Sequence, residues 1–464
     1  MASEQAVADL KQPAERFRVI ARGKLADPRL QEAIDSSTER LRSHRIDAWS
    51  ELDDVEERRE RAYEIRMRAV RDIDGNLNRF RSALEARGGH VSVCASAEEA
   101  NAYVVDVCKR HGAKLLAKSK SMVTEEIGLN DALEAAGITS VETDLGEYIL
   151  QLEGEHPVHI VAPAIEKTKE DVARLFTEAE GVDVPPVLEE LTASARRQLR
   201  HVFLDADVGV TGANFAVAET GTVVTVTNEG NGRLCASLPR VHIVVTGIER
   251  LVERMEDLPH LLSLLGRSAT GQRLTSYTHL VTGPRREGEQ DGPEELHVIF
   301  LENGRRNLIG TKYEEMLACI RCGSCLNVCP VYRKTAGAAY GPVYSGPMGA
   351  VLAPLLVGLD QAPGLPHASS LCGACTQACP VKIPLHELLL ELRSDLVEER
   401  TAPFLERLGF SLWSVAWSTP IGYRISTRLA RLGQRWGSRL GPGRVWAGGR
   451  DLPALARKRF RDVR

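Results

Sequence analysis

The stretch Cys319-Ile-Arg-Cys322-Gly-Ser-Cys325-Leu-Asn-Val-Cys329-Pro330 decides how the C-terminal part of this chain folds. Its four cysteines are separated by two, two and three residues, and a proline follows the last one. With this spacing, three thiolates wrap one [4Fe-4S] cluster, and the fourth ligates a neighbouring cluster in two-cluster proteins. Gly323 gives the loop freedom beside the cluster, where a side chain would crowd the sulfides. The stretch therefore predicts an iron–sulfur module.

A second run, Cys372-Gly-Ala-Cys375-Thr-Gln-Ala-Cys379-Pro380, repeats the last three cysteines of the first run. The position of the absent cysteine holds Ser369. If the last cysteine of each run crosses to the other cluster, the chain binds two [4Fe-4S] clusters with unequal sets of ligands. The first set is Cys319, Cys322, Cys325 and Cys379, and the second set is Cys329, Cys372 and Cys375.

The second cluster lacks one thiolate in this assignment. It either keeps four irons with a serine, water or partner-chain ligand, or it loses one iron and becomes a [3Fe-4S] cluster. Ser369 and Ser370 are the local candidates for a hydroxyl ligand. Net charge and ligation set the reduction potential of such a cluster, so we expect the two clusters to differ in potential.

Two other readings of the seven clustered cysteines, structural zinc and disulfides, are weaker, and the expected reducing compartment argues against disulfides. Structural zinc sites also use Cys-x-x-Cys pairs, but a full four-cysteine run, with both runs followed by proline, argues against zinc. The other three of the ten cysteines, Cys94, Cys108 and Cys235, are scattered along the chain. We expect them to be small buried apolar side chains.

Upstream of the cysteines, apolar runs alternate with helix-like segments such as Ala97–His111 and Lys167–Ala179. This alternation predicts an α/β domain with a mostly parallel sheet, followed by the α-helical ferredoxin-type module. The strand-like runs are Val91–Cys94, Leu115–Ala117, Val158–Ala162, Thr222–Thr227, Val241–Thr246 and Leu296–Phe300.

We expect four parts along the 464 residues. Residues 1–75 form a charged helical arm of two helices, broken near Asp27-Pro28, and residues 76–302 form the α/β domain. Residues 303–400 form the two-cluster module, and residues 401–464 form a basic, Trp-rich tail. Within the module, helices are expected at Lys312–Ala318, around Gly349–Val357, and at Leu385–Glu399.

The α/β domain offers few sharp candidates. Asp205 and Asp207 could hold a divalent cation, although acids at a turn are commoner, and Asn228–Arg233 could be a plain turn or a ligand contact. Lys118–Ser121 could contact an anion, and His242 is expected to be a packed core histidine. No Gly-x-Gly-x-x-Gly follows a strand-like run, which argues against a bound dinucleotide.

Charge is distributed unevenly although the formal net charge is only −4. From Thr401 to Arg464 there are 13 Lys and Arg residues against three acidic ones. Such a basic tail on an acidic body favours a docking surface over a nucleic-acid binder. Five arginines spaced four, three, four and four residues apart share one helical face, with tryptophans between them. They are Arg424, Arg428, Arg431, Arg435 and Arg439, with Trp413, Trp417, Trp436 and Trp446.

The expected location is cytoplasmic, with the tail as a route to peripheral membrane association. Met1 to Phe17 contains no apolar segment of the secretory type. The longest apolar stretch, Phe410 to Tyr423, is too short to cross a bilayer and contains Pro420.

Seven motifs along the chain are informative together: Lys118–Ser121, Glu142–Glu147, Thr211–Asn214, Ala218–Thr222, Asn228–Asn231, Ala318–Pro330 and Leu371–Cys375. With these motifs the chain resembles the lactate-utilisation protein B family over about residues 15 to 460. The resemblance implies an iron–sulfur subunit of a three-protein system that oxidises L-lactate to pyruvate, and in that family the missing eighth cysteine is usual.

The same resemblance implies an N-terminal domain similar to sugar-phosphate isomerases and CoA transferases. It also implies two partners, a cysteine-rich subunit and a second lactate-utilisation-domain protein. We therefore expect an electron-transfer component that is not catalytic alone and that passes electrons to an acceptor such as quinone. The alternatives are the same role for glycolate or another 2-hydroxy acid, an enzyme in its own right, and an iron–sulfur sensor.

Overall fold

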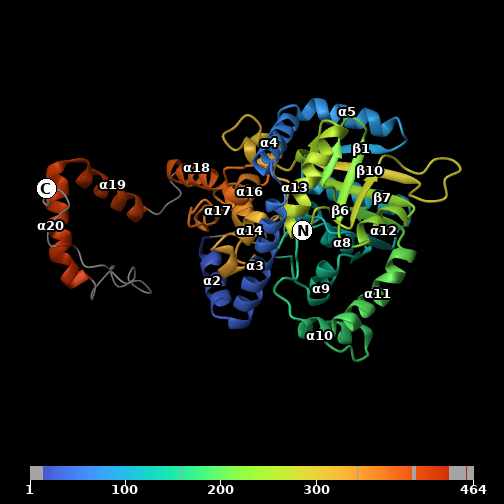
Figure 1. The fold of residues 1–464 in the computed structure, drawn as a ribbon, viewed down its shortest axis with the longest axis horizontal. Coiled ribbons are helices and arrows are strands. Elements are labelled where there is room, and N and C mark those ends of the chain that lie inside the picture. The colour runs from blue at the N-terminus through green and yellow to red at the C-terminus, as the bar shows by residue number, and fades with distance from the viewer. Residues whose placement is uncertain (1–13, 158, 342, 400–403, 438–455, 457–464) are drawn as a thin grey trace. The chain divides into compact units, whose positions relative to one another are not determined.

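The computed structural model describes residues 14–157, 159–341, 343–399, 404–437 and 456 (Figure 1). It divides the chain into two compact units, Met1–Asp395 and Leu396–Arg464. The first unit contains the sheets and the cysteines, and the second contains the last two helices of the tail.

A six-stranded parallel sheet forms the centre of the first unit. The order across it is β1-β10-β7-β4-β2-β3, so the mostly parallel sheet expected from the sequence is confirmed. The strands are β1 (His90–Cys94), β2 (Leu115–Lys118), β3 (Thr139–Glu142), β4 (Val208–Thr211), β7 (Val241–Gly247) and β10 (Glu295–Leu301).

Helices cover both faces of this sheet, which explains why its central strands are almost continuously apolar. One face packs on α6 (Ala97–Arg110), α7 (Met122–Glu126) and α8 (Leu129–Ala135). The other face packs on α5 (Ile73–Glu85), where Phe80 meets Phe300 of β10 edge to face with centroids 5.0 Å apart. β7 is buried along its whole length, including His242.

A smaller, four-stranded sheet has the order β8-β5-β6-β9. Its strands are β5 (Phe215–Val217), β6 (Thr222–Thr227), β8 (Leu251–Val252) and β9 (Tyr277–Val281). Three further helices, α9 (Leu145–Glu153), α10 (Lys169–Glu180) and α11 (Leu188–Asp205), share a small core of their own and lie at the lower right of Figure 1. The remaining helices of the domain are α12 (Asn231–Ser237) and α13 (Leu258–Thr270).

The N-terminal arm contains more helices than the sequence suggested. The break at Asp27-Pro28 is confirmed, because Asp27 caps α3 by accepting the N–H groups of Arg29 and Leu30. The expectation of two helices is wrong, because further breaks occur at residues 51–54 and at Asp72. The helices are α2 (Ala14–Leu25), α3 (Pro28–Ser50) and α4 (Val55–Arg71), followed by α5, which covers the sheet.

The cysteine-rich module is helical, as expected. Its helices are α14 (Ser324–Asn327), α15 (Tyr332–Thr335), α16 (Gly346–Val357), α17 (Ala374–Ala378) and α18 (Leu385–Glu398). The stretch expected to be helical at Lys312–Ala318 is a short 3-10 turn, Glu314–Ala318. Helix α3 packs on α13, α14 and α15, and α4 packs on the 3-10 turn, so the arm joins the module to the α/β domain.

One predicted strand is wrong. Val158 lies outside the described residues, and residues 159–162 form bends and the start of a turn instead of a strand. The cause is local, because the His159 ring Nδ1 accepts the N–H groups of both Val161 and Ala162, at 3.0 Å each. A backbone folded back onto a side chain cannot pair with a neighbouring strand.

The second unit contains α19 (Phe404–Ser418) and α20 (Pro420–Gly437), which pack on each other. The ring centroids of Trp413 and Trp417 lie 5.3 Å apart with the rings tilted by 35°, and Trp417 meets Tyr423 edge to face at 5.1 Å. Within the described residues no helix has the length and apolar character needed to cross a bilayer. Arg439 and Trp446, expected to continue the basic helical face, lie outside the described residues.

Candidate iron–sulfur centres

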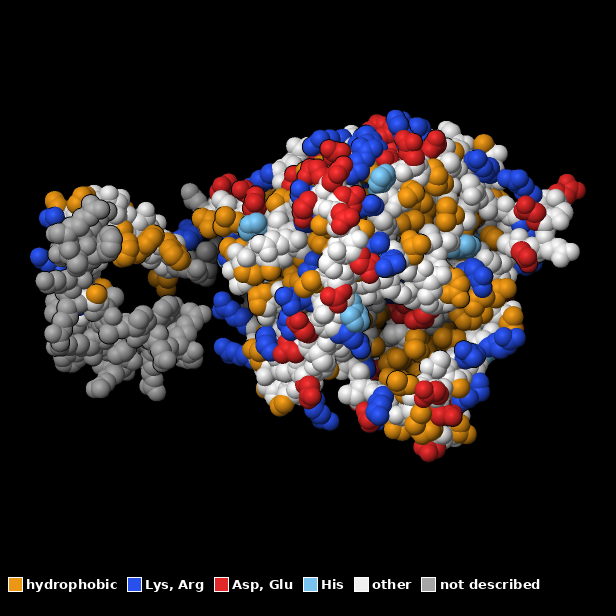
Figure 2. Space-filling view, in the orientation of Figure 1, with side chains coloured by type: hydrophobic (Ala, Val, Ile, Leu, Met, Phe, Trp, Pro, Cys, Tyr) orange, Lys and Arg blue, Asp and Glu red, His pale blue; other side chains and the backbone are white. Residues whose placement is uncertain are grey.

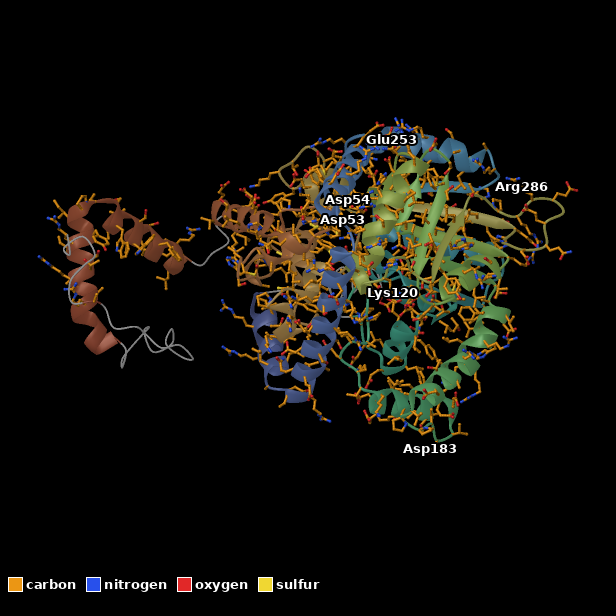
Figure 3. The ribbon with its side chains drawn as sticks, viewed as in Figure 1. Asp53, Asp54, Lys120, Asp183, Glu253 and Arg286 are labelled. Atoms are coloured by element: carbon orange, nitrogen blue, oxygen red, sulfur yellow. The ribbon has the colours of Figure 1, made fainter. Side chains whose placement is uncertain are left out.

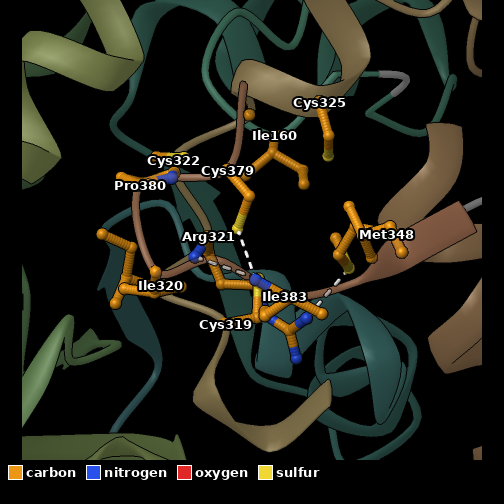
Figure 4. A pocket seen from close by; sticks show the side chains of 13 residues that line it. Ile160, Cys319, Ile320, Arg321, Cys322, Cys325, Met348, Cys379, Pro380 and Ile383 are labelled. Carbon is orange, nitrogen blue, oxygen red and sulfur yellow. Dashed lines mark hydrogen bonds between the residues drawn. The ribbon is translucent and has the colours of Figure 1, made fainter. Parts of the chain in front are cut away.

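Four thiols from both cysteine runs line one cavity. Figure 4 shows this cavity, which Cys319, Cys322, Cys325 and Cys379 share with the apolar side chains of Ile160 and others. Cys379 comes from the second run, so the structure brings together the four residues of the first predicted set. The other lining residues are Ile320, Arg321, Gly323, Met348, Pro380, Val381, Ile383 and Leu385.

The two cysteine runs repeat one backbone conformation. Arg321 and Leu371 each precede the corresponding cysteine with positive φ, 58° and 54°. Gly323 and Gly373 follow it with φ of 76° and 79°, a region that glycine enters without strain. A short helix, α14 or α17, starts directly after each glycine. The loop that wraps a cluster is therefore built twice, although the second copy lacks one cysteine.

The second predicted set is less enclosed. Cys329 and Cys375 are buried, whereas Cys372 is exposed. Hydrogen bonds from the Ala374 N–H and the Ser370 hydroxyl lower the pKa of Cys372. The Ser369 hydroxyl instead accepts the Leu371 N–H at 3.1 Å, so Ser370 is the serine in contact with a thiol of this set.

The surroundings of the thiols fit metal thiolates. Burial, followed by repulsion from other thiols, raises the pKa of Cys325 well above its usual value, and those thiols include Cys322, Cys319 and Cys375. Burial and then Cys329 raise the pKa of Cys375 to about 11. These raised pKa values keep the thiols protonated when no metal is bound, and a metal cluster would take the place of those protons. Cys325 interacts with Cys375, so the two sets adjoin.

Backbone N–H groups point at several of these sulfurs. Arg321 N–H donates to Cys319 Sγ at 3.4 Å, and Ile383 N–H donates to Cys379 Sγ at 3.4 Å. In the second set, Tyr332 N–H donates to Cys329 Sγ at 3.5 Å. Hydrogen bonds to cluster sulfurs are among the factors that set reduction potential.

Sequence reasoning missed a group of buried arginines around the first set, which we call the arginine ring: Arg59, Arg66, Arg250 and Arg321. Three of them hold the backbone that carries the thiols. Arg59 Nη2 donates to the Cys379 carbonyl at 2.8 Å, Arg250 Nη1 to the Cys319 carbonyl at 3.0 Å, and Arg66 Nε to the Ala318 carbonyl at 3.3 Å.

The fourth member, Arg321, lies on the cavity wall itself. Its Nη2 is 3.3 Å from the Glu249 carboxylate, and its guanidinium lies 4.8 Å over the Tyr344 ring. Burial lowers the pKa of Arg321, but interactions with Cys319, Tyr344 and Glu249 outweigh burial and raise it. The cavity therefore has a cationic wall that favours bound negative charge.

A segment of the α/β domain also reaches the cavity. We call residues 159–162 the strap. Its Ile160 lines the cavity, and its His159 Nε2 lies 3.1 Å from Asn327 Oδ1 of α14. Because Nδ1 accepts two backbone N–H groups, Nε2 carries the proton and donates it to Asn327. Burial lowers the pKa of His159 to about 4, which keeps the ring neutral.

The other candidates of the α/β domain have structural roles. Lys118 is fully buried and its ammonium donates to the carboxylates of Glu125 and Glu142, so it is paired inside the domain, and an anion contact of Lys118–Ser121 stays a prediction. Asp207 accepts the N–H groups of Lys114 and Leu115. His242 is a packed core histidine, as expected, with Nε2 at 2.8 Å from the Thr211 hydroxyl.

The remaining candidates fit the same pattern. Cys94, Cys108 and Cys235 are buried in the apolar cores, as expected. Asn228 makes turn contacts through its amide, to Gln272 and to Ser276. Among the described residues, Asp205 makes no contact that suggests a cation.

Comparison with known proteins gives the family. A family model described as the LUD domain matches residues 77–301, and one described as a 4Fe-4S dicluster domain matches residues 315–383. Lactate utilization protein B of Bacillus licheniformis is 48% identical over 439 residues, 93% of this chain and 92% of that protein. The protein of the same name from Bacillus subtilis shows the same identity and coverage.

A crystal structure of a DUF162 family protein from Deinococcus radiodurans is also similar, at 14% identity and a TM-score of 0.27. It covers 50% of this chain and 98% of its own. Nearly half of all residues are shared with the two Bacillus proteins over almost the whole length, across both the sheet domain and the cysteine runs. The chain belongs to the lactate utilization protein B family, and it carries an iron–sulfur dicluster domain.

Proposed function

We propose that the chain is the iron–sulfur electron-transfer subunit of a complex that oxidises L-lactate to pyruvate. In this proposal Cys319, Cys322, Cys325 and Cys379 ligate the first cluster, and Cys329, Cys372 and Cys375 ligate the second. Each cluster carries one electron at a time, so the two electrons from an oxidation elsewhere in the complex pass through the clusters one by one. The chain's own residues hold the clusters, shield the first from water and supply positive charge beside it.

The observation that carries this proposal is the cavity shared by thiols of both runs. Electrons pass between two clusters only when the clusters lie close together, and Cys325 of the first set interacts with Cys375 of the second. Three thiols of the first set are buried and Cys319 is half-buried, whereas the second set reaches the surface at Cys372. This difference in exposure supports entry or exit of electrons at the second cluster. The name of the relatives, lactate utilization protein B, supports lactate as the substrate of the complex.

The test is a pair of crossed variants in anaerobically purified protein. The wild type should be brown and contain about seven to eight irons per chain. Cys379→Ser should damage the first cluster although it lies in the second run, and Cys329→Ser should damage the second. Electron paramagnetic resonance of the reduced proteins separates the two clusters.

Cys108→Ser is the matched control, because Cys108 is fully buried but lies in the core of the α/β domain. It should leave both signals intact. Loss of the cluster in the mutated residue's own run would reverse the ligand assignment. Stoichiometric zinc without visible charge-transfer absorption in the wild type would overturn the central claim.

We also propose that α19 and α20 dock a partner subunit of the complex and thereby also bring the chain to a membrane. Several large apolar side chains of these helices are exposed, among them Phe404, Leu405, Phe410 and Leu412. Arg424 and Arg428 are exposed on α20. Exposed apolar helix faces next to basic residues are typical of interaction sites.

A further inference from the structure

The motifs that carry the family resemblance in the α/β domain converge on one place, at the carboxyl edge of the parallel sheet. Lys118 is the last residue of β2, and Glu142 is the last residue of β3. Glu125 comes from α7 and Glu147 from the first turn of α9. In open α/β sheets, ligands bind outside the carboxyl ends of the strands.

Only part of this cluster is internally satisfied. The Lys118 ammonium donates to Glu125 Oε1 at 2.7 Å and to Glu142 Oε1, and Asn130 Nδ2 donates to Glu142 Oε1 at 2.8 Å. By contrast, Glu142 Oε2 and both carboxylate oxygens of Glu147 are buried without any hydrogen-bond partner among the described residues. The Glu147 residue is only 2% exposed.

Negative charge exceeds positive charge at this place. Three carboxylates, each offering an oxygen within 4.8 Å of the others, face the single ammonium of Lys118. Lys120 lies nearby, but Asp144 and Glu229 add two more acids around it. Burial and then the charge of Glu142 raise the pKa of Glu147 well above its usual value. A buried carboxylate in such surroundings needs a proton or a cation.

The edge of the cluster comes close to the surface, where the Glu125 side chain is 13% exposed. Figure 3 shows Lys120 between α8 and α9 in this view, and Figure 2 shows the surface hollowed there with acidic side chains inside the hollow. The helix that carries Glu147 runs on toward the strap, whose Ile160 lines the cavity of the first thiol set. An ion at Glu147 would therefore bind α9, the helix that precedes the strap in the chain.

We propose that Glu125, Glu142 and Glu147 bind a divalent cation of the Mg²⁺ or Mn²⁺ class. The donor atoms are all carboxylate oxygens, which hard cations prefer, whereas zinc and copper sites use imidazole or thiolate ligands. The ion takes the unpartnered oxygens of Glu142 and Glu147 and completes its coordination with water. This site is separate from the proposed electron carrier, because no cluster ligand belongs to it.

The experiment is a titration of the full-length, cluster-loaded protein with Mn²⁺, following loss of the free-ion signal by electron paramagnetic resonance. We expect one saturable site, from which Mg²⁺ displaces Mn²⁺. Glu147→Gln, which keeps the shape of the side chain, should weaken Mn²⁺ binding by at least about tenfold. Iron content and cluster spectra should stay unchanged, so failure here is distinguishable from failure of the electron-transfer proposal.

Glu134→Gln is the matched control, because Glu134 is an exposed glutamate of α8 in the same domain. It should bind Mn²⁺ like the wild type. Thermal melting gives a second readout, since an ion that binds only the folded state raises the melting temperature. Absence of saturable Mn²⁺ binding in the wild type, or equal binding by Glu147→Gln, would overturn the proposal and leave a shared proton as the counter-charge.

Discussion

Replacing Arg321 with glutamine should lower the reduction potential of the proposed first cluster. Arg321 lies on the wall of the cavity with Cys319, and its side chain is only 9% exposed. A cation beside the cluster stabilises the reduced state, which carries one more negative charge than the oxidised state. Glutamine removes that charge but keeps a long polar side chain, and it tolerates the φ of 58° no worse than arginine does.

The size of the effect follows from Coulomb's law with partial cancellation. A unit charge roughly 6 Å from the cluster is worth about 3 kcal/mol at an effective dielectric constant of about 20. Glu249, whose carboxylate is 3.3 Å from the guanidinium, offsets part of this attraction. A net change of about 2 kcal/mol corresponds to about 90 mV for a one-electron couple.

The assay is a potentiometric titration followed by electron paramagnetic resonance, with the wild type, Arg321→Gln and Arg321→Lys compared at equal iron content. Arg321→Lys keeps the charge and should recover most of the potential. Arg254→Gln, at an exposed arginine of the same unit, should not shift it. A first-cluster potential in Arg321→Gln that stays within about 20 mV of the wild type would refute the reasoning.

Three further outcomes are expected. Deleting residues 405–464 should leave iron content intact but abolish salt-sensitive co-purification with partner subunits and membranes, and a truncated chain that still co-purifies would make the tail merely structural. Lys118→Met leaves the buried Glu125 and Glu142 without their counter-ion and should cost about 3–5 kcal/mol, seen as a lower melting temperature. Burial lowers the pKa of His242 to about 3, below the value of about 6.5 for a histidine in the unfolded chain. The neutral ring therefore adds fully to the free energy of unfolding above about pH 6.5. Below that pH the unfolded state gains a proton, and the free energy of unfolding falls by up to about 1.4 kcal/mol per pH unit. Melting curves from pH 7.5 to pH 4.5 should show this slope below about pH 6.5 and lose part of it in His242→Gln, whereas an unchanged slope contradicts the assignment.

The sequence predicted those features that depend on residues close together in the chain. The cysteine spacing predicted which thiols would share a cavity, because each run is a short loop whose geometry its own glycine and proline fix. The longer apolar runs were confirmed as β6, β7 and β10. Short strands with polar residues, such as β3 at Thr139–Glu142, were missed because four residues are too few to show an alternation of apolar and polar side chains.

Features that join distant segments could not be predicted in this way. The arginine ring draws its members from α4, the 3-10 turn Ile248–Arg250 and the first cysteine run, which lie up to 262 positions apart in the printed numbering. The strap looked like a strand because Val158–Ala162 is mostly apolar, yet Ile160 and Val161 pack in the core that contains the clustered cysteines. Tertiary contacts override an apolar pattern when another surface competes for it.

The ring has a consequence for how the two proposed clusters work together. A cluster with four thiolates carries more negative charge than one with three, which alone would place the first cluster at the lower potential. The structure puts Arg59, Arg66, Arg250 and Arg321 around the complete thiolate set. Among the described residues, the main causes that shift the pKa values of the second set's thiols include no cation, and the nearby Arg42, Arg45 and Arg333 line a cavity beside α17. Positive charge therefore offsets the additional thiolate and brings the two potentials closer, which favours electron exchange between the clusters. On this argument Arg321→Gln should widen the gap between the two measured potentials by moving the first and leaving the second in place.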